Sequence, residues 1–203
     1  MLHEHDVERL APLWAPFHDE GLELEVDAGR SRLQPEGLRL AAEVLDRREG
    51  GAAVGFFDRL IGPADAWHKS SLTYDAFQRR GIARRVLSAS VALYDSLGVG
   101  RVHLNAVGPG RYVWARCGFD FAEDARAAAT DRARALAEEL GYDLGEVAHA
   151  WELAERGERV ARFDEPLGRV LLLRSGIGDW DGVLDLSASS PGRGVFERYC
   201  RPS

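Results

Sequence analysis

The stretch QRRGIA, residues 78–83, is the most informative part of this 203-residue chain. It lies between a segment with the pattern of a β-strand, residues 66–74, and a helical pattern that begins at Ile82. Successive backbone N–H groups at a strand-to-helix turn, together with the positive end of the helix dipole, bind anions such as phosphate groups. Gly81 allows a ligand to approach the backbone closely, and arginines at 79, 80, 84 and 85 add positive charge. These residues fit a phosphate-binding turn, and they also fit an ordinary turn before a solvated basic helix.

The segments around this turn predict a mixed α/β fold. The helix has one apolar stripe that ends just before Gly98, formed by Ile82, Val86, Ala89, Leu93 and Leu97. Before the turn, the apolar runs at 38–45 and 52–60 are separated by DRREGG and predict a β-hairpin, and residues 22–26 predict a short strand. After the helix we expect a strand at 101–106, a GPG turn, a short helix at 111–117 and a strand at 119–122.

The two ends of the chain are less regular. Residues 5–18 have helical spacing of apolar residues, and residues 124–140 are rich in Ala and Arg and predict a helix. A further helix is expected up to Gly157, because Asp143 and Glu146 have the spacing of a capping box and an apolar stripe follows, formed by Leu144, Val147, Trp151 and Ala154. We expect a strand at 169–174 and a turn at DWDG, residues 179–182, followed by a Pro/Gly-rich tail. The chain is therefore expected to be one domain, residues 1–203, with a core of about 5–122 plus 166–203 and a helical insertion at about 123–165 before the last strand.

Composition and charge exclude several classes of protein. Apolar residues make up 45% and charged residues 29%, as in ordinary globular proteins. The net charge of −7 opposes nonspecific binding to nucleic acid, and no run approaches the ~20 apolar residues of a membrane-spanning helix. The N-terminal segment lacks the apolar stretch of a signal peptide, and Cys117 and Cys200 have no metal-binding spacing. We expect a cytoplasmic protein without a metal site, a nucleic-acid partner or a membrane anchor.

Residues 78–83 match the pattern [QR]-x-x-G-x-[GA], which resembles the acyl-CoA-binding motif of the GNAT superfamily of N-acyltransferases. In that family the motif follows the fourth strand and opens the third helix, as predicted here. The resemblance continues through VHLNA at 102–106 and the Gly-Phe pair at 118–119, and it covers about 52–122 best, 5–51 loosely and 123–203 hardly at all. It implies a GNAT-type mixed, mostly antiparallel central sheet with flanking helices.

The resemblance also implies a function and a set of binding residues. The chain is expected to use acetyl-CoA as acyl donor and to transfer the acetyl group to an amine of a small molecule, peptide or protein, by direct attack in a ternary complex. Carried over by position, the residues that contact the coenzyme are Leu72, Thr73 and Tyr74 on the strand, Gln78, Arg79, Arg80, Gly81, Ile82 and Ala83 in the turn, and Asn105. Asn105 instead fits a residue that caps the turn before GPG.

The resemblance is incomplete at the residues that would move protons. The family's tyrosine, which protonates the leaving thiolate, sits four residues before the glycine of Gly-Phe, and Trp114 occupies that position here. Tyr112 is the candidate general acid, and its alternative is an aromatic side chain that packs on the coenzyme or the core. His68, on the strand before the turn, is the candidate base, since a histidine titrates near neutral pH, and His103 is a second candidate. Each histidine also fits a buried structural role.

Two alternatives therefore remain open. The missing tyrosine and the absence of a glutamate on the strand before the turn suggest a catalytically weakened or inactive coenzyme-binding or regulatory protein with the same fold. An acyltransferase that acts on charged tRNA is opposed by the net charge.

Because the stripe of Leu144, Val147 and Trp151 must be buried somewhere, we also expect that a second copy of the chain can cover it as a homodimer.

Overall fold

The computed structural model describes residues 21–78 and 80–200, so the helix expected at 5–18 lies outside the described residues, as does Arg79. The chain divides into two compact units. In the described residues, unit one is the segment up to Val102 together with Cys200, and unit two is the segment His103–Tyr199.

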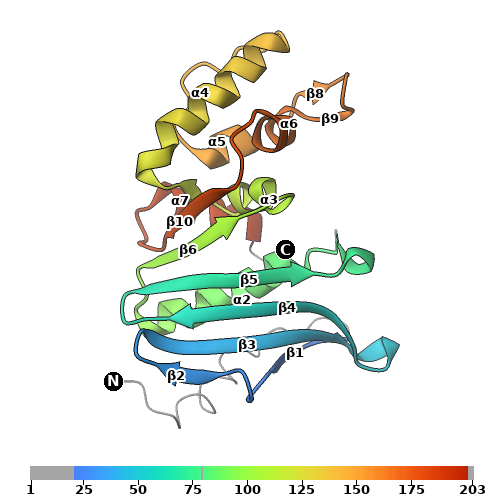
Figure 1. Ribbon diagram of the computed structural model, residues 1–203, viewed down its shortest axis with the longest axis vertical. Helices are drawn as coiled ribbons and strands as arrows, with labels where there is room; N and C mark the ends of the chain where they lie inside the picture. The colour runs from blue at the N-terminus through green and yellow to red at the C-terminus, as the bar shows by residue number, and fades with distance from the viewer. Residues whose placement is uncertain (1–20, 79, 201–203) are drawn as a thin grey trace. The chain divides into compact units, whose positions relative to one another are not determined.

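Unit one contains an antiparallel sheet. Its strands are β1 (Leu22–Val26), β2 (Arg32–Gln34), β3 (Gly37–Asp46), β4 (Ala52–Ile61) and β5 (Asp65–Thr73). Strand β3 pairs with β1, β2 and β4, and β4 pairs with β5, all of them antiparallel (Figure 1). The expected hairpin is confirmed as β3 and β4, which are joined by a short 3-10 turn, η2 (Arg47–Glu49), where the Asp46 side chain accepts a hydrogen bond from the Arg48 backbone.

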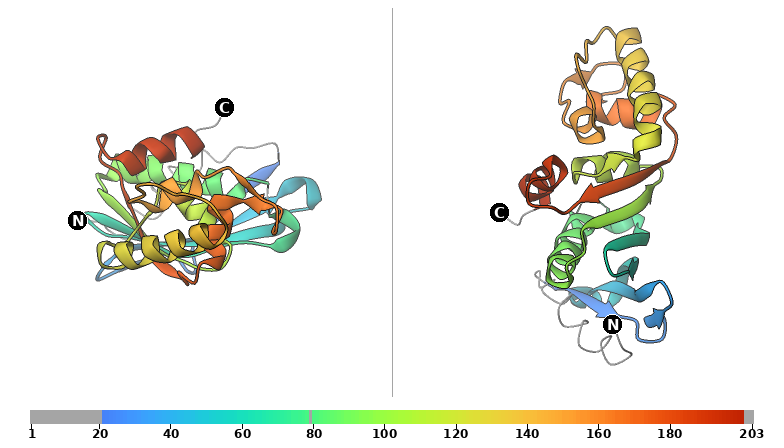
Figure 2. Two further views of the ribbon diagram at one scale, coloured as in Figure 1. Left: turned by 90° about the horizontal axis from the view of Figure 1, so that it is seen from above. Right: turned by 90° about the vertical axis from the view of Figure 1, so that its left-hand side faces the viewer.

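Helix α2 (Ile82–Leu97) covers one face of this sheet (Figures 1 and 2). The helix buries the predicted stripe except for its last residue, Leu97, which is half-buried, and Gly98 ends the helix in the left-handed conformation with φ 73°. On the strands, the facing side chains have almost no exposure, as Leu38, Leu40, Phe57 and Ile61 show. This layer of apolar side chains is the core of unit one.

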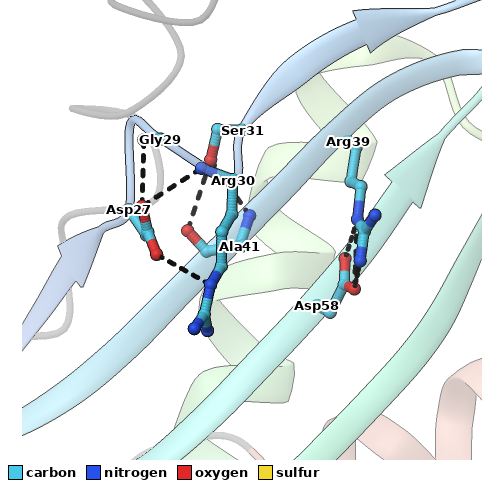
Figure 3. A network of polar contacts seen from close by, with 7 residues as sticks. All are labelled: Asp27, Gly29, Arg30, Ser31, Arg39, Ala41 and Asp58. Carbon is cyan, nitrogen blue, oxygen red and sulfur yellow. Dashed lines mark hydrogen bonds and ion pairs between the residues drawn. The ribbon is translucent and has the colours of Figure 1, made fainter.

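Polar contacts hold the opposite face and the turn between β1 and β2 (Figure 3). The Asp27 carboxylate accepts hydrogen bonds from the backbone N–H groups of residues 29 and 30. Ser31 exchanges hydrogen bonds with the backbone of Ala41 on β3. Arg39 on β3 donates to both carboxylate oxygens of Asp58 on β4, each at 3.1 Å from Nε. The face of the sheet away from α2 is therefore partly polar.

Unit two contains short strands and helices. Its elements, in chain order, are β6 (Arg101–Ala106), which begins just before the unit, α3 (Gly110–Arg116), β7 (Asp120–Phe121), α4 (Glu123–Glu139), α5 (Ala150–Ala154), β8 (Arg159–Val160), β9 (Glu165–Pro166), α6 (Leu167–Arg174), β10 (Trp180–Asp185) and α7 (Pro191–Cys200). Strand β10 pairs antiparallel with β7, and β8 pairs antiparallel with β9. Helix α5 packs against α3 and α6, and α4 also packs against α6.

The expected fold class, a mixed α/β protein with a mostly antiparallel sheet and flanking helices, is confirmed. The helical region before the last strand is also present, but it extends beyond residue 165 because it includes α6. The boundaries of the single domain stay a prediction.

Three expectations for the second half of the chain are wrong. Residues 169–174 belong to helix α6 rather than a strand, and the helix expected from Asp143 to Gly157 is only the five residues of α5. Residues 180–182 lie in strand β10 rather than in a turn.

The physical reasons are local. Val170, Leu171 and Leu172 in α6 are buried, and Gly168 lets the helix approach α5 so closely that a Cβ there would lie 2.2 Å from the Leu153 carbonyl oxygen. A fully buried apolar run has no periodicity that separates helix from strand. The Asp143 side chain accepts from the backbone of Gly145 in its own loop, and the Glu152 carboxylate instead accepts from the backbone at the start of α5.

Candidate functional site

The turn between β5 and α2 is contiguous and belongs entirely to unit one. Strand β5 ends at Thr73, and a single 3-10 turn, η3 (Asp75–Phe77), leads to residue 78. The Gln78 side chain donates to the Asp75 carboxylate at 2.7 Å, which fixes the beginning of the turn. Gly81 then adopts φ 75° and is the residue immediately before α2.

The start of α2 has no side-chain cap. Gly81 supplies no capping oxygen, and no acidic residue lies in the first turn of the helix. The first backbone N–H groups of a helix need partners from outside the helix, and the helix dipole makes this end attractive to anions. Among the described residues, a Cβ on Gly81 would meet the Arg84 guanidinium alone, at 3.8 Å, so the positive φ rather than crowding favours glycine here.

Two arginine side chains, Arg80 and Arg84, lie beside this turn. The Arg80 guanidinium lies over the Phe77 ring at 5.1 Å and 3.7 Å from the buried Asp46 carboxylate. Arg84 projects back toward Gly81, as the distance above shows. Sequence reasoning did not connect Asp46 with this turn, because no motif links a hairpin residue to a loop more than thirty positions later.

The end of β5 carries exposed apolar side chains. Leu72 is 51% exposed and Tyr74 is 40% exposed, whereas most large apolar residues of unit one are buried. Leu72 lies opposite Phe56 on β4, and Thr73 lies opposite Gly55. An exposed apolar strand end thus precedes the η3 turn, which leads to the uncapped helix start.

His68 lies in the interior of unit one. The β4–β5 register shifts after Asp58, so that Arg59 pairs with His68 and Lys69 is the extra residue. His68 is only 6% exposed, and its Nε2 lies 3.0 Å from the hydroxyl of Tyr94 on α2. Burial, and next the charge of Arg59, hold the pKa of His68 well below its usual value.

Burial also shifts the pKa values of the two neighbours of His68, Arg59 and Tyr94. Desolvation lowers the pKa of Arg59 to about 10 and raises the pKa of Tyr94 to about 12. The Arg59 guanidinium donates to the Ser70 carbonyl oxygen at 2.6 Å. This cluster holds β4, β5 and α2 together, which favours the structural role that the sequence left open for His68.

The remaining candidates belong to unit two. The Asn105 side chain on β6 donates to the Asp181 carboxylate on β10 at 3.0 Å, while the Gly108 backbone in the GPG turn donates to Asp179. Trp114 is a core residue, 7% exposed and edge-on to Phe119. The hydroxyl of Tyr112 accepts a hydrogen bond from Arg116 at 3.0 Å. His103, the second candidate base, is half-buried on β6.

Unit two also contains a polar cluster that sequence reasoning missed. The Asp120 carboxylate, 6% exposed, accepts from His149 Nδ1 at 2.7 Å, from Arg126 at 2.9 Å and from the Ala150 backbone. It therefore joins β7, α4 and the start of α5. No short motif could reveal this cluster, because Asp120 and His149 are separated by 29 positions.

The described residues include neither a metal-binding group nor a membrane-spanning helix. Across residues 21–78 and 80–200, no group of three or more His, Cys, Asp or Glu side chains is placed to hold a metal ion. None of the helices in these ranges combines the length and the apolar character that crossing a membrane requires.

Comparisons with known proteins found similarity between parts of this chain and several solved structures. No protein-family model and no curated protein matches the sequence. Solved structures do match parts of it. Ard1 from Thermoplasma volcanium is 16% identical, with a TM-score of 0.37, over 40% of this chain and 56% of its own. An acetyltransferase from Thermus thermophilus is 24% identical, with a TM-score of 0.38, over 44% of this chain and 57% of its own.

A GNAT family acetyltransferase from Elizabethkingia anophelis was solved with acetyl-CoA bound. It is 9% identical, with a TM-score of 0.40, and the match covers 52% of this chain and 80% of the acetyltransferase. The last of these structures is described as a GNAT family acetyltransferase, the family whose motif residues 78–83 resemble. The chain spans little more than half the length of the first two. Each of these three TM-scores is below 0.5.

Proposed function

We propose that the chain is an N-acyltransferase of the GNAT type, which transfers an acetyl group from acetyl-CoA to an amine of a small molecule, peptide or protein. The observation that supports this most is the turn at 78–83, where β5 passes through Gly81 into an uncapped helix start surrounded by arginines. A diphosphate is the ligand chemistry that such a turn accepts best, since several N–H groups converge on it.

The residues around the turn fit the rest of the coenzyme. In this proposal, the backbone N–H groups from Gln78 to Ala83 hold the diphosphate, with positive charge from Arg79, Arg80 and Arg84. The exposed apolar end of β5, Leu72 and Tyr74, supplies a surface for the pantetheine arm, and the backbone of Thr73 lies between them. Asn105, already bonded to Asp181, serves on β6 as a further polar contact.

When bound, acetyl-CoA would supply the acetyl thioester. The amine nitrogen forms the new N–C bond, the C–S bond breaks, the thiolate receives a proton and the amine gives one up. Tyr112 is the proposed proton donor to sulfur. A thiolate with a pKa near ~8.5 leaves tolerably without protonation, and positioning alone supplies ~7–11 kcal/mol, so this acid would assist the reaction rather than be essential to it.

The amine must also lose a proton, and the burial of His68 limits its use as the acceptor. His68 would serve only an amine that reaches the buried side of β5, and its lowered pKa makes it a weak base at neutral pH. Its contact with Tyr94 supports a structural role instead. Solvent would then accept the amine proton in place of His68.

A second candidate function is a coenzyme-binding protein of the same fold without turnover. Buried Trp114 at the family's acid position and the absence of a glutamate on β5 favour it. It differs from the first candidate only in the chemical step, because both need the turn at 78–83.

The test is release of free CoA from acetyl-CoA in the presence of a panel of amines, including polyamines and peptides with free N-termini or lysines. The acyltransferase predicts steady, amine-dependent release together with an acetylated product detected by mass spectrometry. Binding of acetyl-CoA without release for any amine would support the second candidate. A chain that does not bind acetyl-CoA at all would contradict both.

A further inference from the structure

Tyr112 on α3 lies between two guanidinium groups of unit two. Arg116, one helical turn later, donates from Nη1 to the phenol oxygen at 3.0 Å, and its Cζ lies 5.8 Å from the ring centroid. Arg169 on α6 also contacts the ring, with its Cζ 5.7 Å from the centroid. The phenol is thus flanked by positive charge from two helices.

The two arginines differ in how their charge is balanced. Arg169 donates to the Glu165 carboxylate at 3.2 Å, so it has an ordinary ion-pair partner. In the part of the chain that the structure describes, no carboxylate lies within ion-pair distance of Arg116. Its other neighbour is the Tyr199 ring, 4.6 Å from Cζ. Arg116 is therefore a half-buried cation whose hydrogen-bonding partner is the phenol.

The electrostatics of Arg116 agree with this arrangement. Burial lowers the pKa of the guanidinium, but the hydrogen bond and charge of Tyr112, with the charges of Tyr199 and Cys117, raise it above its usual value overall. A guanidinium also cannot accept a hydrogen bond, so it can only donate to the phenol oxygen. The phenol's own proton then points away from Arg116 and is available for another acceptor.

We propose that Arg116 is the positioning residue for Tyr112: it fixes the phenol oxygen and offsets the negative charge that forms there. This inference rests on the proposed function. When the C–S bond breaks, the proton of the Tyr112 hydroxyl moves to the sulfur, which leaves as a thiol. The phenolate that remains lies beside Arg116 until it regains a proton from solvent, which restores the starting state.

Arg116→Gln tests this inference, with Arg169→Gln as the matched control. Both variants remove a guanidinium next to the Tyr112 ring, but only the first removes the donor to its oxygen. We expect kcat to fall roughly tenfold or more in Arg116→Gln, as for the loss of a hydrogen bond to a charged group, with the KM for acetyl-CoA little changed. Arg169→Gln should change kcat by less than about threefold, and Arg116→Lys should recover part of the loss.

The same substitution in a Tyr112→Phe background separates positioning from a merely structural role. If Arg116 acts through the phenol, Arg116→Gln costs nothing further once the hydroxyl is gone. An equal loss of kcat in both backgrounds would overturn the inference, because it would show that Arg116 acts on folding or binding instead.

A spectroscopic measurement tests the contact between Arg116 and Tyr112 without depending on activity. In protein labelled with ¹³C at the tyrosine Cζ, the Tyr112 signal is identified by its absence in Tyr112→Phe. We expect it to shift in Arg116→Gln and to stay in place in Arg169→Gln, and an unmoved signal in both would overturn the inference. If the parent shows no acyl transfer, the proposed function fails, whereas this arm still decides whether Arg116 holds the phenol.

Discussion

The cluster of Arg59, His68 and Tyr94 shows how burial changes a single titratable residue. His68 is neutral in the folded protein because desolvation holds its pKa well below the ordinary value near 6.5. In the unfolded chain the imidazole is solvated and binds a proton below about pH 6.5. The unfolded state therefore binds more protons than the folded state in this range, so the free energy of unfolding must fall as the pH is lowered below about 6.5.

Denaturant unfolding at several pH values between 7 and 5 measures this effect. One proton corresponds to a slope of at most about 1.4 kcal/mol per pH unit. We expect His68→Gln, which retains a hydrogen-bonding group for Tyr94, to have a shallower dependence on pH than the parent by about that amount. Parallel curves for parent and variant would show that His68 takes up its proton in the folded state as readily as in the unfolded chain.

At the scale of elements, the packing of α7 on the end of α3 depends on two glycines. Gly118 follows α3 with φ 89°, and a Cβ there would lie 2.2 Å from the Gly192 carbonyl oxygen at the start of α7. Such a contact cannot be relieved by a side-chain rotation, because both atoms belong to fixed backbone. The Gly-Phe pair that extends the family resemblance thus has a packing reason in this chain.

Gly118→Ala is expected to cost at least about 2 kcal/mol of the free energy of unfolding, since it combines a positive φ with a steric overlap. Gly176→Ala is the matched control, because Gly176 has φ 77° and no atom within 4 Å of its would-be Cβ. It should cost only the conformational part, about 1 kcal/mol. Equal losses in urea unfolding would mean that α7 moves away to admit the methyl group.

The elements that sequence reasoning predicted correctly are those with strong periodicity and clear ends. The stripe from Ile82 to Leu97 ends at a left-handed glycine, and the hairpin of β3 and β4 has a charged, glycine-ended connection. Helix α6 was mistaken for a strand because its apolar residues are buried without periodicity. Helix α7 was not expected, although Ser190 before Pro191 is a typical helix start.

For the candidate site, the turn at 78–83 was predictable because its residues are consecutive and its chemistry is carried by the backbone. The surroundings of His68 were not, since its decisive neighbour, Tyr94, comes from another element. The same holds for Arg169 beside the Tyr112 ring, whereas Arg116 lies one turn away on the helix of Tyr112. Burial of His68 in particular depends on the register shift between β4 and β5, which a sequence pattern does not show.

At the scale of the whole molecule, the chain consists of two compact units. The apolar stripe of Leu144, Val147 and Trp151, which was expected to need a partner, is largely buried within the second unit. Leu144 and Trp151 are 5% and 9% exposed within the chain, and Val147 is half-buried. Burial of this stripe therefore no longer requires a second copy, and a homodimer stays a prediction without that support.

The central claim is that the turn before α2 binds the diphosphate of acetyl-CoA, and calorimetric titration of Gly81→Asp with acetyl-CoA tests it most directly. Aspartate at a helix N-terminus favours folding, but its carboxylate would face the phosphates. At about 4 Å, two like charges cost ~1–4 kcal/mol, so we expect binding to weaken by at least roughly fivefold.

Gly98→Asp is the control, because Gly98 has nearly the same backbone, φ 73° against 75°, at the other end of the same helix. The account predicts that Gly98→Asp binds acetyl-CoA as the parent does, while Gly81→Asp binds it much more weakly. If Gly81→Asp is folded and binds acetyl-CoA as tightly as the parent, the turn at 78–83 does not hold the diphosphate.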